Sequence, residues 1–130
     1  MVMSARVLIV DDSKVVRDLH GFMLEGGGYE VQHAINGSEA LEMAITTHFD
    51  LIVTDVNMPH MDGYELTRRI RATAGYESTP IIIVSTESEA RDKTRGFEAG
   101  ANVYVVKPAR PNNLVANARM LLGALASQEI

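Results

Sequence analysis

The sequence has no cysteine among its 130 residues. Without thiols it can form neither a disulfide framework nor a thiolate metal site, which fits a reducing compartment. Basic residues are also few, since 12 Lys and Arg stand against 17 Asp and Glu for a formal net charge of −5. Nucleic-acid binding depends on Lys and Arg that neutralise phosphates, so a nucleic-acid partner is not expected.

Long apolar stretches are missing too. No uninterrupted apolar segment approaches the roughly 20 residues that a bilayer-spanning helix needs. The first residues show no charged leader followed by an apolar run and a cleavage site. We therefore expect a cytoplasmic protein without membrane insertion.

The chain does contain enough apolar residues for one ordinary domain. Hydrophobic residues make up 46% of the sequence, sufficient for a core without disulfides. No internal repeat, linker or low-complexity tract divides the chain. We expect one domain over residues 1–130, with its core at about 5–125 and frayed final residues 126–130.

The hydrophobic pattern switches repeatedly between strand and helix types. Strands are predicted at 6–10, 29–34, 50–55, 81–85 and 103–106, and the second alternates like a half-exposed edge strand. Helices are predicted at 13–25, from a cap at residue 36 through 45, at 63–73, from 86 to about 100, and from 111 onward. Five strands alternating with five helices predict an α/β fold, a doubly wound parallel sheet with the flavodoxin-like strand order 2-1-3-4-5.

Local signals support these helices. Asn36 with Glu39, and Thr86 with Glu89, have the form of capping boxes. Apolar residues recur at helical spacing on one face of each helix. In the first helix they are Val15, Val16, Leu19, Phe22 and Met23; in the second, a buried stripe of Ala40, Leu41, Ala44 and Ile45; in the last, an inner face of Leu114, Leu121, Leu122 and Leu125.

Charged residues follow three of the predicted strands. Asp11 and Asp12 end the first apolar run, Asp55 ends another, and Lys107 follows the last. Parallel strands finish at the same sheet edge, so we expect three carboxylates and one ammonium in one crevice, with Ser85 between Asp55 and Lys107. Like charges held together repel, and a divalent cation with a phosphoryl group would explain the arrangement. Mg²⁺ prefers carboxylate and phosphate oxygens, and Asp55 can act as a nucleophile that forms an aspartyl phosphate.

Four segments together identify a family. They are Val10–Ser13, Thr54–Gly63, Val84–Ser85 and Val106–Pro108. In this order and spacing they resemble the receiver domain of bacterial two-component response regulators, over about residues 6–125. The likeness is to stand-alone, chemotaxis-type (CheY-like) receivers.

The resemblance implies a phosphoacceptor switch and not an enzyme with turnover. A sensor histidine kinase or a phosphotransfer protein would donate a phosphoryl group from a phosphohistidine to Asp55, and Ser85 and Lys107 would contact that group. The implied Mg²⁺ ligands are Asp11 (through water), Asp12, Asp55 and the main-chain carbonyl of Asn57.

The same resemblance implies how a signal leaves the site. Tyr104 would be the aromatic switch that turns inward on activation, together with Ser85. The Lys107–Pro108 bond would be cis. The face formed by the fourth helix, fifth strand and fifth helix would bind a downstream protein in chemotaxis or another phosphorelay. We expect a monomer, with dimerisation on activation as the alternative.

Some positions depart from the family or bear on other functions. Thr86 stands where Ala or Gly is usual, and Ala109 stands where Phe is common. Asn57 and Glu87 occupy positions that tune the acyl-phosphate lifetime in the family.

One alternative is a small Mg²⁺-dependent phosphohydrolase with an aspartyl-phosphate intermediate, but Asn57 stands where such enzymes place a second Asp and cannot shuttle a proton. Another is a receiver-like scaffold that is never phosphorylated.

Overall fold

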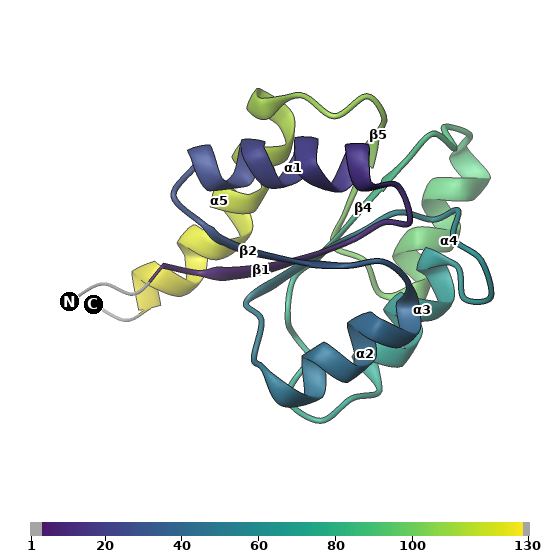
Figure 1. Cartoon of the computed structure of the whole chain (residues 1–130), viewed down its shortest axis with the longest axis horizontal. Coiled ribbons are helices and arrows are strands. Elements are labelled where there is room, and N and C mark those ends of the chain that lie inside the picture. Colours follow the sequence, from purple (N-terminus) through teal and green to yellow (C-terminus); the bar gives the residue numbers. More distant parts are fainter. Residues whose placement is uncertain (1–3, 129–130) are drawn as a thin grey trace.

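Five parallel strands form one sheet in the order β2-β1-β3-β4-β5 (Figure 1). The computed structural model describes residues 4–128, and side chains for residues 4–123. The strands are β1 (Arg6–Val10), β2 (Glu30–Ala34), β3 (Leu51–Thr54), β4 (Ile81–Ser85) and β5 (Val103–Val106). The helices are α1 (Lys14–Gly26), α2 (Gly37–Thr46), α3 (Gly63–Arg71), α4 (Ala90–Ala99) and α5 (Pro111–Gln128). The predicted flavodoxin-like α/β fold is confirmed.

Two helical layers cover the two faces of the sheet. Helices α1 and α5 lie on one face, and α2, α3 and α4 on the other (Figure 1). In β1, Val7 and Ile9 belong to one buried core cluster, and Leu8 and Val10 belong to the other. Strands β3 and β4 are buried at every residue, as their continuous apolar runs predict.

The start of α3 lies directly against the end of β3 because residue 63 is glycine. A Cβ atom on Gly63 would overlap the main-chain carbonyl oxygen of Asp55. The Gly63 N–H donates to the carbonyl of Val56 at 2.9 Å. Asp62 caps the helix by accepting from the N–H of Glu65 at 2.9 Å. These contacts fix the loop between β3 and α3, which begins with Asp55.

Helix α4 begins later than predicted. Its capping box pairs Glu89 with Asp92, so the predicted box of Thr86 and Glu89 is wrong. The hydroxyl of Ser85 accepts from the N–H of Glu87 at 3.1 Å, which gives the backbone an alternative to a helical turn. Residues 86–89 therefore form a loop at the edge of the sheet. The helix ends at Gly100 in the left-handed region (φ 116°), as predicted.

The apolar stripes of α1 and α2 are covered only in part. The apolar face of α1 is largely exposed, with Val15 at 77% and Phe22 at 78% exposure, and α1 buries His20, Gly21 and Leu24 instead. Ile45 in α2 is 75% exposed, so its place in the buried stripe is wrong, whereas Ala40 and Ala44 are buried. Helical spacing finds an apolar stripe but does not say whether the sheet covers it.

Other expectations have mixed outcomes. The Lys107–Pro108 bond is cis, as predicted. Asn36 caps α2 by accepting from the N–H of Glu39, but Glu39 accepts in return from Ile35, one residue before the expected partner. Fraying from residue 126 is wrong as far as Gln128, because α5 runs to that residue. The side chain of Leu125 and residues 129–130 lie outside the described part of the chain.

No helix of the described residues is both long enough and apolar enough to span a lipid bilayer.

Candidate functional site

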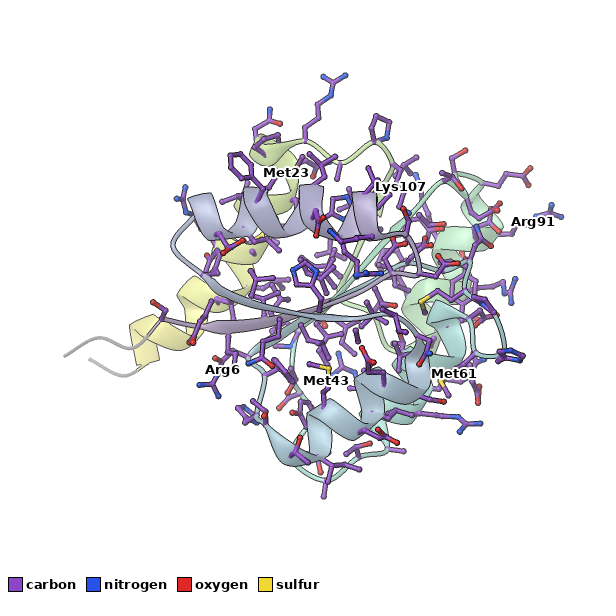
Figure 2. All side chains as sticks on the ribbon, viewed as in Figure 1. Arg6, Met23, Met43, Met61, Arg91 and Lys107 are labelled. Carbon is purple, nitrogen blue, oxygen red and sulfur yellow. The ribbon has the colours of Figure 1, made fainter. Side chains whose placement is uncertain are left out.

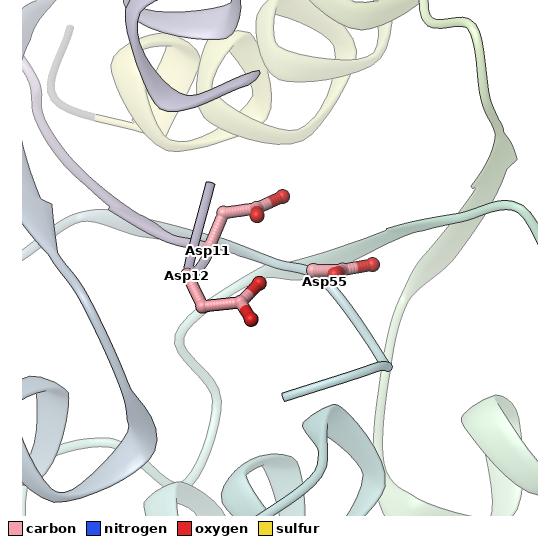
Figure 3. A group of neighbouring side chains, drawn as sticks. All are labelled: Asp11, Asp12 and Asp55. Carbon is pink, nitrogen blue, oxygen red and sulfur yellow. The ribbon is translucent and has the colours of Figure 1, made fainter. Parts of the chain in front are cut away.

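Three carboxylates meet where β1 and β3 end. Strand β1 pairs with β3 so that Val10 lies opposite Thr54, and the next residues along the two strands are Asp11 and Asp55. One oxygen from each of Asp11, Asp12 and Asp55 lies within 4.8 Å of the other two. Figure 3 shows the three side chains next to one another, just beyond the ends of β1 and β3. The predicted convergence of these residues is confirmed.

Lys107 reaches this acidic group from the end of β5. Its Nζ lies 3.1 Å from Asp11 Oδ2 and 3.2 Å from Asp55 Oδ1. The side chains of Lys107, Asp11 and Asp55 are 16%, 2% and 8% exposed, so water screens these ion pairs poorly. In Figure 2, Lys107 lies at the opposite end of the sheet from Arg6, which begins β1.

Burial sets the electrostatics of Asp55. It raises the pKa of the Asp55 carboxyl above its ordinary value; the Lys107 ammonium opposes this rise, and the Asp11 carboxylate adds to it. Charged Asp55 is thus held in an unfavourable environment that a further cation would relieve. A carboxyl group in a cleft whose pKa is shifted by burial and by neighbouring charges is typical of a functional site.

The donor set fits a hard divalent cation. Asp12 is exposed, and within the described part of the chain its carboxylate makes no hydrogen bond or ion pair, so it is free to bind. Three carboxylates against one ammonium leave the group with an excess of negative charge. Oxygen donors with a net negative charge suit Mg²⁺, which keeps several waters and takes few carboxylates. A hollow of about 310 Å³ lined by Asp12, Asn36 and His60 lies beside this carboxylate.

Ser85 and Tyr104 both contact one loop residue, Glu87. The Ser85 side chain is buried at the end of β4, and its Oγ accepts from the N–H of Glu87 at 3.1 Å. The hydroxyl of Tyr104 in β5 donates to the carbonyl of Glu87 at 2.8 Å. The side chain of Glu87 accepts from Asn57 Nδ2 at 3.3 Å. The loop 86–89 therefore links the sheet edge to the face around Tyr104.

Helix α4 leaves space for the Tyr104 ring. A Cβ atom on Gly96 would lie 2.9 Å from Tyr104 Cδ2. The hydroxyl of Tyr64 in α3 donates to the carbonyl of Asp92 in α4 at 3.1 Å, and the guanidinium of Arg95 lies 4.4 Å from the Tyr64 ring centre. Helix α4 therefore borders the Tyr104 ring, and Tyr64 of α3 contacts α4 through Asp92 and Arg95.

Two residues near the carboxylates were not anticipated from the sequence. Arg17 in α1 donates from Nη1 to the main-chain carbonyl of Asp11 at 2.6 Å. His20 in α1 is buried; burial lowers its pKa, the charge of Lys107 lowers it further, and that of Asp11 opposes the shift. Both lie on one helix after the first strand, but only tertiary packing shows which residues of α1 face the site.

Comparisons with known proteins agree with this geometry. A family model described as the response regulator receiver domain matches residues 7–119. The chain is 42% identical over 102 residues to the gliding motility regulatory protein of Myxococcus xanthus, matching 78% of this chain and 13% of that protein. It is 37% identical over 120 residues to the transcriptional regulatory protein SrrA of Staphylococcus aureus, matching 92% of this chain and 48% of that protein. The chain thus spans about half the length of these curated relatives, or less.

Solved structures give the same result over nearly whole chains. The chemotaxis protein CheY4 of Vibrio cholerae aligns with a TM-score of 0.87 and 39% identity, covering 92% of this chain and 99% of that chain. A CheY-like receiver domain protein of Methanospirillum hungatei aligns with a TM-score of 0.88 and 28% identity, covering 97% and 99%.

Proposed function

The chain belongs to the response regulator receiver domain family of two-component systems, and we propose that it is a Mg²⁺-dependent phosphorylation switch with Asp55 as the phosphoacceptor. The observation that carries the proposal is the cluster of Asp11, Asp12 and Asp55, with Lys107 bound to two of its members. Receivers bind Mg²⁺ at such an acidic pocket and take phosphoryl groups from histidine kinases or phosphotransfer proteins. We further propose that the chain works as a cytoplasmic, stand-alone receiver in chemotaxis or another phosphorelay; its likeness to the chemotaxis protein CheY4 supports the chemotaxis role.

Each side chain has a task in the proposed transfer. Asp12, Asp55 and the main-chain carbonyl of Asn57 would hold the metal, with Asp11 acting through water. When bound, Mg²⁺ neutralises charge on the phosphoryl oxygens. An oxygen of Asp55 forms the new P–O bond while the P–N bond of the donor phosphohistidine breaks, and the donor imidazole keeps the electron pair and takes up a proton.

Lys107 and Ser85 then change partners. The ammonium of Lys107, already within 3.2 Å of Asp55, shifts to the new phosphoryl oxygens. The Ser85 hydroxyl turns from the N–H of Glu87 to donate to the same group. Loss of that contact frees the loop 86–89, and Tyr104 leaves the Glu87 carbonyl and turns inward. A downstream protein would read the change on the face of α4, β5 and α5, where Phe97 is exposed.

Phosphorylation by acetyl phosphate with Mg²⁺ tests this function. Intact-mass analysis should find one added phosphoryl group on the wild-type protein and none on Asp55→Asn. Asp18→Asn, which removes an exposed carboxylate on α1, is the matched control and should label normally. Undiminished labelling of Asp55→Asn would refute the assignment. Sustained release of phosphate from small phosphoesters would instead favour the phosphohydrolase, against which the amide of Asn57 argues.

A further inference from the structure

The guanidinium of Arg17 hydrogen-bonds to one main-chain carbonyl beside the acidic cluster. Its Nη1 donates to the carbonyl of Asp11 at 2.6 Å. Its Nε is buried and has no hydrogen-bond partner within the described part of the chain. A buried donor without a partner is costly, so the position of this side chain needs a compensating role. The bond to the Asp11 carbonyl is the contact that can supply it.

That carbonyl lies in the peptide between two of the three carboxylate residues. A peptide unit is planar, so the Asp11 carbonyl and the Cα atom of Asp12 move together. The Asp11 side chain has its own restraints, from the N–H of Ser13 at 2.9 Å and from Lys107. The carboxylate of Asp12 has none in the described structure, so the backbone that precedes it sets its direction.

We propose that Arg17 is a positioning residue for the carboxylate of Asp12, holding the Asp11–Asp12 peptide so that this carboxylate faces Asp55. The inference rests on the proposed function, in which Asp12 binds Mg²⁺. On the other side of Asp11, its N–H donates to the carbonyl of Ala34 in β2 at 3.2 Å. The main chain of Asp11 is therefore hydrogen-bonded to Arg17 of α1 through its carbonyl and to Ala34 of β2 through its N–H.

The sign of one substitution separates positioning from simple charge. Arg17 is a cation close to the metal-binding carboxylates, and its removal would by Coulomb's law alone tighten Mg²⁺ binding. Loss of positioning has the opposite effect, because Asp12 would spend time turned away from the site. We expect Arg17→Met to weaken Mg²⁺ affinity by about tenfold, the lower end of the usual range for outer partners of metal ligands.

Isothermal titration of the full chain with MgCl₂ provides the measurement. Lys14→Met is the matched control, since it removes an exposed cation from the same helix and should leave the affinity unchanged or slightly tighter. Arg17→Lys keeps the charge and can donate from a single nitrogen on a shorter stem, so its affinity for Mg²⁺ should fall between those of wild type and Arg17→Met. Unchanged or tighter binding by Arg17→Met overturns the proposal.

A second measurement needs no metal. Hydrogen exchange of the Asp11 amide in EDTA should be faster in Arg17→Met than in Lys14→Met, measured against a core amide of β4 in each protein. An Arg17 that only adds to global stability would speed both amides together, and that result would also overturn the proposal. Should Arg17→Met fail to fold, Arg17→Lys decides: weaker Mg²⁺ binding at unchanged charge supports positioning, and wild-type affinity excludes it. Failure of the wild-type protein to bind Mg²⁺ would remove the proposed function itself.

Discussion

Replacing Lys107 by methionine should destabilise the metal-free protein and tighten Mg²⁺ binding at the same time. Methionine keeps much of the stem but removes the ammonium that lies between Asp11 and Asp55. The two largely buried carboxylates then repel each other, with no cation between them. A bound Mg²⁺ would take over the lost neutralisation, so the variant gains more from the metal than the wild-type protein does.

The magnitudes follow from burial. Removing one partner of a buried ion pair costs about 3–5 kcal/mol, and we expect about 3 kcal/mol because the cluster opens to solvent beside Asp12. We expect Mg²⁺ to bind the variant about tenfold more tightly, which corresponds to roughly 1.4 kcal/mol. By linkage, tighter binding of Mg²⁺ to the folded variant raises its free energy of unfolding by the same amount, roughly 1.4 kcal/mol, relative to wild type. In saturating Mg²⁺ the difference in unfolding free energy between the two proteins should therefore fall from about 3 to roughly 1.6 kcal/mol.

Urea unfolding followed by circular dichroism, in EDTA and in saturating Mg²⁺, measures the difference in unfolding free energy under each condition. Titration calorimetry measures the affinity for Mg²⁺ independently. Lys14→Met breaks an exposed ion pair of α1 and should change stability by at most about 1 kcal/mol under either condition. A Lys107→Met destabilisation that is identical with and without Mg²⁺, or a weaker affinity for the metal, would refute this account of the charges. The same variant should label with acetyl phosphate but signal poorly, because the phosphoryl group lacks its cationic partner.

Three further outcomes follow from the structure. Because burial raises the pKa of Asp55 above its ordinary 3.8, the folded state binds the proton more tightly than the unfolded chain; metal-free stability should therefore rise relative to Asp55→Asn as pH falls through that raised pKa, as urea midpoints would show. Gly63→Ala should cost about 1–3 kcal/mol and weaken Mg²⁺ binding, since the added Cβ meets the Asp55 carbonyl. Tyr76→Phe should cost about 1–3 kcal/mol but leave Mg²⁺ affinity unchanged, because its buried hydroxyl donates to Ala44 and accepts from Phe49 far from the site.

The convergence of the acidic residues could be predicted because it depends on topology alone. Apolar runs buried on both faces predict parallel strands, and parallel strands end at one edge of the sheet. Residues that directly follow such strands, Asp11 and Asp55, must then be neighbours whatever the details of packing. The reach of Lys107 over the end of β4 follows from strand spacing and side-chain length.

The failures lie where local and tertiary interactions compete. Thr86 and Glu89 match a capping box, but the Ser85 hydroxyl and Tyr104 hold Glu87 in a loop, and the helix starts after them. The exposed apolar stripe of α1 has the same periodicity as a buried one, so spacing could not show which side faces the sheet. The contact of Arg17 with a main-chain carbonyl also left no signature, because backbone atoms do not appear in a residue pattern.

Glu87 hydrogen-bonds to Ser85, Tyr104 and Asn57 through different atoms. Its peptide N–H and carbonyl serve Ser85 and Tyr104, whereas only its carboxylate meets Asn57. Any amino acid with a peptide N–H and carbonyl can keep the backbone connection between Ser85 at the end of β4 and the hydroxyl of Tyr104. Replacing the Glu87 side chain should therefore remove the contact with Asn57 and leave the backbone contacts with Ser85 and Tyr104 in place.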